Sequence, residues 1–140
     1  MVNVLSMVHK FMWFFCLLVT TGMVQAQEEE QFQAWMQEVN QTNGRLKLNI
    51  EGNYGDDAVA DTVKLQELFG KMATFFEQKS SDAADYALSA MGGYKRVGEL
   101  ISTGDSEQAM AIYYETRANC SNCHAAHRGR TSAGAYKIIY

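Results

Sequence analysis

The chain contains no proline in its 140 residues. Proline is the strongest helix breaker among the amino acids, because it lacks an amide hydrogen and its ring clashes with the preceding turn. Apolar side chains make up 47% of the chain, which is enough to form the core of one domain of this length. We therefore predict an all-α fold in a single domain.

Four segments after residue 27 are predicted to be helical, at about 28–50, 56–79, 82–103 and 106–128. In the first three, apolar residues recur three or four positions apart, which places them on one helix face. Four helices of roughly 20 residues joined by short turns predict an antiparallel up-down-up-down four-helix bundle. The side chains expected in the core of the second and third helices are Leu65, Leu68, Phe69, Met72, Phe76, Ala84, Leu88, Met91, Tyr94 and Ile101.

Polar residues mark the expected helix ends. The expected N-caps are Asp56 or Asp57, the run Ser80-Ser81-Asp82, and Asp105, which with Gln108 resembles a capping box. Gly129 is expected to stop the last helix, and the tail from 129 to 140 is expected to pack along the bundle. Within the first helix, Asn43-Gly44 predicts a bend or fray, because glycine costs ~1 kcal/mol relative to alanine there.

Residues 1–26 have the pattern of an export signal. His9 and Lys10 precede the apolar run 11–19 (FMWFFCLLV), and Val24-Gln25-Ala26 supplies small residues for a signal peptidase. An uncleaved membrane anchor is the alternative, but this run is shorter than the ~20 apolar residues that span lipid. We therefore predict cleavage after Ala26, export to the periplasm, and a mature domain of residues 27–140 with no membrane insertion.

The charge of the chain restricts its partners. The formal net charge is −4, from 12 basic and 16 acidic side chains, and loss of Lys10 with the signal makes it one unit more negative. A nucleic-acid-binding protein would carry a basic stripe, so we expect no nucleic acid, and an anionic membrane surface is also disfavoured. A basic patch on another protein is a plausible partner.

Two cysteines follow the predicted cleavage site, in the sequence Cys120-Ser121-Asn122-Cys123-His124. A lone CxxC pair closes too short a loop to support a disulfide-stabilised fold. CxxCH, however, is the attachment signature of c-type haem. Two thiols three residues apart on one helix face can each add to a haem vinyl group, and the following histidine can bind the iron. The sequence therefore predicts one covalent haem c on Cys120 and Cys123, with His124 as an axial ligand.

Three alternatives to haem attachment fit the sequence less well. A thioredoxin-type redox pair expects a βαβ context, which the sequence lacks. A zinc site could use Cys120, Cys123, His124 and His127, but those residues share one helix face, whereas Cys₂His₂ sites take their pairs from separate elements. The third alternative is a chance match, which is rare behind an export signal in a chain with so few cysteines.

The position of the motif near the C-terminal end of a helical chain resembles the class II cytochromes c, the group that includes cytochrome c′. The continuation Ala125-Ala126-His127-Arg128 resembles the family ending CxxCH-x-x-aromatic-Arg, with His127 in the aromatic position. This resemblance implies a four-helix bundle that contains one haem and acts through redox partner proteins. Members often pair through their first two helices, so it also implies a possible homodimer.

The second axial position decides between two functions that the resemblance allows. Some family members fill it with a methionine from the first helix and transfer electrons, whereas others leave it open and bind small gases such as NO or CO. In the family the distal residue falls about ten residues into the mature chain, which corresponds to Met36. Met72 and Met91 fit the bundle geometry less well. The expected function is electron transfer with His124/Met36 ligation, and gas binding at a five-coordinate iron is the alternative.

Arg128 is expected to pair with a haem propionate, with ordinary solvated surface as the alternative. His127 is one turn after His124 and is expected to contact a propionate or the haem ring. Trp35, Phe32, Phe76 and Tyr113 are expected in the core and the pocket wall. No second group of acid, base or nucleophile accompanies the motif, so we expect no enzyme activity.

Overall fold

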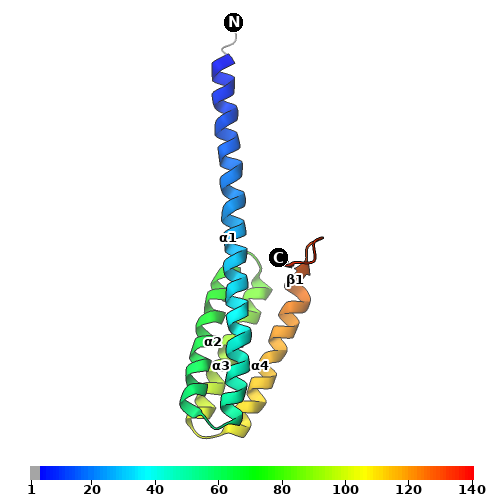
Figure 1. Cartoon of the computed structure of the whole chain (residues 1–140). Coiled ribbons are helices and arrows are strands. Elements are labelled where there is room, and N and C mark those ends of the chain that lie inside the picture. Colours follow the sequence, from blue (N-terminus) through cyan, green and yellow to red (C-terminus); the bar gives the residue numbers. More distant parts are fainter. Residues whose placement is uncertain (1–3) are drawn as a thin grey trace. The chain divides into compact units, whose positions relative to one another are not determined.

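The computed structural model describes the backbone of residues 4–140 and the side chains of residues 27–140. Its elements in chain order are α1 (Val4–Glu51), α2 (Gly55–Phe76), α3 (Ser81–Ser102), α4 (Ser106–His127), β1 (Arg128–Arg130) and β2 (Tyr136–Ile138) (Figure 1). The chain divides into two compact units, Met1–Ala34 and Trp35–Tyr140. The predicted export signal, residues 1–26, lies outside the residues whose side chains are described. No helix in the described part of the chain is long and apolar enough to cross a membrane.

The second unit is an all-α four-helix bundle, which confirms the predicted fold class. Its helices are α2, α3, α4 and residues 35–51 of α1, and they run alternately in opposite directions (Figure 1). The core of α2 is as predicted, since its five expected side chains are all buried: Leu65, Leu68, Phe69, Met72 and Phe76. These apolar side chains supply the burial that stabilises helices of this length in a bundle.

The buried face of α3 differs from the prediction. Leu88 was expected in the core but is 48% exposed. The helix instead turns a line of mostly small side chains inward: Ala83, Ala87, Ala90, Tyr94, Val97 and Gly98. Tyr94 is buried as predicted, but Ala83, Ala87 and Ala90 each replace the expected residue one position later. The small side chains of this line let α3 approach its neighbours closely.

Two glycines of α3 lie directly opposite threonines of the neighbouring helices. A Cβ added at Gly93 would overlap the Thr116 hydroxyl on α4 and lie 2.7 Å from Thr116 Cγ2. A Cβ added at Gly98 would lie 2.5 Å from Thr62 Oγ1 on α2. Each threonine hydroxyl donates a hydrogen bond to a carbonyl of its own helix, over 2.7 Å in both cases. The threonines are therefore held in place, and only glycine fits opposite them.

Helix α1 continues through Asn43-Gly44 without interruption, so the predicted bend or fray is wrong. The Tyr94 hydroxyl donates to Asn43 Oδ1 over 2.8 Å, and the Tyr113 hydroxyl donates to the Asn43 carbonyl over 3.1 Å. A buried hydrogen bond contributes about 1 kcal/mol, which offsets the ~1 kcal/mol that Gly44 costs inside a helix. Contacts with α3 and α4 thus override the local sequence signal.

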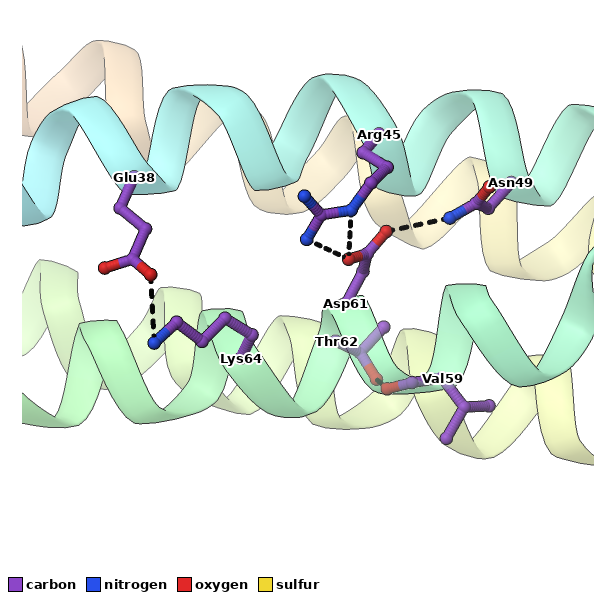
Figure 2. A network of polar contacts seen from close by, with 7 residues as sticks. All are labelled: Glu38, Arg45, Asn49, Val59, Asp61, Thr62 and Lys64. Carbon is purple, nitrogen blue, oxygen red and sulfur yellow. Dashed lines mark hydrogen bonds and ion pairs between the residues drawn. The ribbon is translucent and has the colours of Figure 1, made fainter.

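A polar network joins α1 to α2 (Figure 2). Arg45 Nε donates to Asp61 Oδ1 over 2.7 Å, and Asn49 Nδ2 donates to Asp61 Oδ2 over 2.9 Å. The Asp61 side chain is only 5% exposed, so these donors supply the pairing that a buried carboxylate requires. Further along the same two helices, Lys64 pairs with Glu38 at 3.0 Å. The network fixes the register of α1 on α2.

The helix ends agree only partly with the sequence signals. Asp105 caps α4 as predicted, since its side chain accepts a hydrogen bond from the Gln108 amide over 3.1 Å. Asp56 and Asp57 are not caps, because α2 begins at Gly55 and both carboxylates lie within its first turn. Here they face the positive end of the helix dipole, where negative charge is also favourable.

The start of α3 and the end of α4 also differ from the capping predictions. Ser80 occupies the N-cap position of α3 without a side-chain capping bond, because its hydroxyl donates to Asp82 Oδ1 over 2.6 Å. Gly129 does not stop α4. The helix already ends at His127, Arg128 has extended backbone angles, and Gly129 belongs to β1.

The tail forms a small hairpin, which the sequence did not predict. Strands β1 and β2 are antiparallel, with the pairs Arg128↔Ile138, Gly129↔Lys137 and Arg130↔Tyr136. Gly134 occupies the turn with φ of 83°, a backbone conformation that glycine adopts without strain. Pairing continues one step beyond the strands, since the Ile139 amide donates to the His127 carbonyl over 2.8 Å. The hairpin therefore follows directly from the last turn of α4.

Candidate haem-attachment site

The last two turns of α4 carry the three reactive side chains of the motif. Cys120, Cys123 and His124 are all half-buried, whereas Ser121 and Asn122 are exposed. Residues three and four apart on an α-helix lie on the same side and are separated by about 4.5 to 6 Å along the axis. The two thiols and the imidazole therefore share one side of α4.

Both thiols are free in the structure. Burial raises the pKa of the Cys120 thiol, and burial together with the neighbouring Cys120 raises the pKa of the Cys123 thiol to about 11. A thioredoxin-type redox pair requires the opposite, because its attacking cysteine has a lowered pKa. The electrostatics of this pair thus disfavour the redox alternative.

The two histidines of the motif region have different surroundings. His124 makes no hydrogen bond within the described residues, and burial, with a smaller contribution from Arg128, lowers its pKa. This environment favours the neutral ring, whose nitrogen lone pair can bind a metal.

His127, by contrast, is buried and uses both ring nitrogens. Nδ1 lies 3.0 Å from the Ile139 carbonyl oxygen, and Nε2 lies 3.1 Å from Asp82 Oδ2. The ring also lies 6.3 Å from that of Phe76 and 6.4 Å from that of Tyr86. His127 thus fills an aromatic position and anchors the end of α4 to α3 and the tail.

These contacts bear on the zinc alternative. A zinc site on this helix would need His127 as its fourth ligand, but the ring is turned towards Asp82 and Ile139. Among the residues whose side chains are described, no group of three or more His, Cys, Asp or Glu side chains could hold a metal ion. The arrangement leaves His124 as the histidine of this helix that is available to a cofactor.

Tyr94 and Asn43 form a buried polar pair beside Cys120. Burial raises the pKa of Tyr94 well above its ordinary value, and the sulfur of Cys120 lies close enough to contribute to that rise. The tyrosine hydroxyl donates to Asn43 Oδ1 over 2.8 Å. The sequence pattern predicted Tyr94 only as a core residue and Asn43 only as a helix interruption. A polar residue on an otherwise apolar helix stripe was the signal available for finding this pair.

The register between α1 and α4 determines the level of Met36 in the bundle. The Tyr113 hydroxyl donates to the Asn43 carbonyl, so these two residues lie at nearly the same height. Met36 is seven residues before Asn43, and Cys120 is seven residues after Tyr113, which corresponds to about 10.5 Å in each helix. Because the helices are antiparallel, both displacements run towards the same end. Met36 is half-buried and lies at the level of the CxxCH motif.

Aromatic rings gather at this end of the bundle. The ring of Phe75 lies 6.4 Å from that of Trp35 and 5.1 Å from that of Phe76. Tyr140 lies 6.4 Å from Phe75 and 6.3 Å from Phe76. Trp35 and Phe76 therefore line the end of the bundle that carries the motif, whereas Tyr113 is a buried core residue.

Arg128 is exposed, and its guanidinium stacks on the ring of Tyr136, with 3.6 Å between Cζ and the ring centroid. Within the described residues it makes no ion pair with a carboxylate. Its predicted pairing with a haem propionate stays a prediction.

No family model, curated protein or solved structure matches the chain. The resemblance to the class II cytochromes c therefore depends on residues 120–128 and on the bundle itself.

Proposed function

We propose that this protein is an exported monohaem c-type cytochrome of the class II kind that transfers electrons between redox partner proteins. Haem would be bound by thioethers to Cys120 and Cys123, with His124 and Met36 as axial ligands. The observation that carries the proposal is the chemistry of one helix side, which presents two free thiols and an imidazole without a protein partner. When bound, the haem supplies a one-electron iron couple.

The residues of this chain would hold the cofactor in a fixed orientation. The two cysteines attach it to a rigid helix, and His127 restrains the last turn of that helix through Asp82 and Ile139. The rings of Trp35 and Phe76 supply apolar surface at the same end. Rigid support of this kind lowers the reorganisation that accompanies each electron.

Met36 supports electron transfer over gas binding, because the register of α1 on α4 brings it level with the motif. As an iron ligand, the Met36 thioether would raise the reduction potential of the haem. If Met36 only packed against the haem, the site would be open to NO or CO. The two functions therefore differ in the role of one sulfur atom.

The test is to express the full chain with haem-maturation machinery and to record visible spectra of oxidised and reduced protein, with and without carbon monoxide. We expect a low-spin spectrum in wild type and a high-spin, carbon-monoxide-reactive spectrum in Met36→Leu, which keeps the volume but removes the sulfur. Met91→Leu is the matched control, because Met91 packs against Gly70 on α2, and its spectrum should equal that of wild type.

Two outcomes would contradict the proposal at different levels. A high-spin wild-type spectrum that responds to carbon monoxide would replace electron transfer with gas binding. Covalent haem that survives in the Cys120→Ser/Cys123→Ser double variant would overturn the attachment site itself.

A further inference from the structure

The charges of the chain are unevenly distributed along it. All 16 acidic side chains lie before residue 116, whereas residues 116–140 carry Arg117, Arg128, Arg130 and Lys137. Three of these four basic residues belong to the hairpin that follows α4. The hairpin is therefore a locally positive segment in a protein of negative net charge.

The hairpin displays two guanidinium groups on one face. Arg130 is paired across the strands with Tyr136, and Arg128 lies two residues before Arg130, so all three point to the same side. The Cζ atoms lie 3.6 Å (Arg128) and 4.3 Å (Arg130) from the Tyr136 ring centroid. Arg130 also donates to the Tyr136 hydroxyl over 2.8 Å and to the Gly134 carbonyl over 3.0 Å. Stacking holds both side chains in one orientation before any partner arrives.

The positive charge of the hairpin is not neutralised internally. Arg128, Arg130 and Lys137 are exposed, and none of them forms an ion pair with a carboxylate among the described residues. The carboxylate at the base of the hairpin, Asp82, is occupied by the Ser80 hydroxyl and by His127. The arginines are therefore available to an external anionic surface.

The hairpin is fixed beside the candidate haem site. Arg128 follows His124 by four residues, and the strands begin where α4 ends. His127 and Ile139 exchange two hydrogen bonds, of 2.8 Å and 3.0 Å, and Tyr140 packs against Phe75 and Phe76. A partner that docks on the hairpin would thus lie next to the candidate haem site.

We propose that the face of Arg128, Arg130 and Tyr136 is the docking surface for an acidic patch on a redox partner protein. Lys137 is paired with Gly129 and points to the other side of the hairpin, where it adds to the local positive charge. This inference rests on the proposed function and names the class of its partner. It reverses the expectation of a basic partner patch that the net charge alone suggested. An acidic partner is repelled by the protein as a whole and attracted at the hairpin, and such a field orients the encounter.

An anionic membrane is the competing occupant. Membrane attraction of this type uses clusters of about 4–8 basic residues, and the hairpin supplies three in a chain with 16 acidic side chains. Charge complementarity therefore favours a protein partner.

The test uses the haem-loaded full-length protein and hexacyanoferrate(III), a small trianion that stands in for an acidic patch. Oxidation of the reduced protein is followed by stopped flow over a range of ionic strength. We expect the rate to fall as salt is added, despite the negative net charge. In Arg130→Gln/Lys137→Gln the low-salt rate should drop by about three- to tenfold, and the salt dependence should flatten. The control Lys95→Gln/Arg96→Gln removes the same charge from the exposed side of α3, and we expect its low-salt rate to stay within twofold of wild type.

Three outcomes would overturn the inference. The wild-type rate could rise with salt, or the α3 control could lose as much rate as the hairpin variant. The third is sedimentation of wild type, but not of the hairpin variant, with phosphatidylglycerol vesicles, which would assign the hairpin to membranes. The spectra described above are read independently, so a failed proposed function is distinguishable from a failed docking surface.

Discussion

Gly92 and Gly93 are adjacent in α3 but differ in their surroundings. A Cβ added at Gly92 meets no atom within 4 Å, whereas one at Gly93 runs into the side chain of Thr116. The threonine is buried, and its hydroxyl donates to the Ile112 carbonyl over 2.7 Å, so it cannot rotate away without losing that bond. The substitutions Gly92→Ala and Gly93→Ala therefore test the α3–α4 contact with the same chemical change.

The size of the effect follows from two terms. Alanine in place of glycine stabilises a helix interior by about 1 kcal/mol, and this term is common to both variants. Overpacking a well-filled contact costs about 1–3 kcal/mol, and only Gly93→Ala incurs it. We expect Gly92→Ala to raise the free energy of unfolding by about 0.5–1 kcal/mol. The free energy of unfolding of Gly93→Ala should be about 2 kcal/mol lower than that of Gly92→Ala. This difference corresponds to roughly 8 °C in Tm for a domain of about 110 residues.

The assay is urea and thermal unfolding of the two variants and wild type, followed by circular dichroism at 222 nm. The double variant Gly93→Ala/Thr116→Ala should recover part of the loss, because it removes Oγ1 and Cγ2 but keeps the Cβ, which is 3.0 Å from the added methyl group. The reasoning is refuted if Gly93→Ala stabilises the protein as much as Gly92→Ala does, since α4 would then not contact α3 at this point.

Three further predictions concern polar contacts. Arg45→Met should lower the free energy of unfolding by about 1–2 kcal/mol, because the buried Asp61 carboxylate loses its charged donor. Urea titration measures this change, and an unchanged midpoint would contradict the network of Figure 2. Asn43→Ala should lower the free energy of unfolding by about 2 kcal/mol and Tyr94→Phe by about 1 kcal/mol. The cost of Asn43→Ala is larger because this variant leaves the buried Tyr94 hydroxyl without its acceptor. The reverse order of midpoints would count against this pairing. His127→Phe keeps an aromatic ring but removes both hydrogen bonds of His127. Trypsin should therefore cut within the hairpin several times faster than in wild type. Equal cleavage rates would show that these bonds do not hold the tail.

Much of the fold could be predicted from the sequence, because helical periodicity and the absence of proline are local signals. The errors have physical causes. Leu88 is more hydrophobic than the alanines of α3, but the close approach of the helices selects small side chains for the core. The hairpin was missed because its strands, three residues each, lack the alternating apolar pattern of a half-buried sheet.

The candidate site, like the fold, could be predicted only in part from the sequence. The CxxCH motif is contiguous, so its three reactive residues could be found from the sequence alone. The contacts around it join distant residues: Tyr94 meets Asn43 across 51 positions, and His127 meets Asp82 across 45. No local pattern encodes such pairs, so only the packed bundle reveals them.

The close contacts of α3 also have a consequence for sequence variation. At two places the space between α3 and a neighbouring helix holds the side chain of only one of two facing residues. The facing positions are 93 and 116, and 98 and 62. A substitution that adds volume at one member of a pair is tolerated only where the other member loses it. In homologous chains these positions should therefore covary, with threonine opposite glycine or two small residues together, and such pairs would identify the bundle even in a homologue without the CxxCH motif.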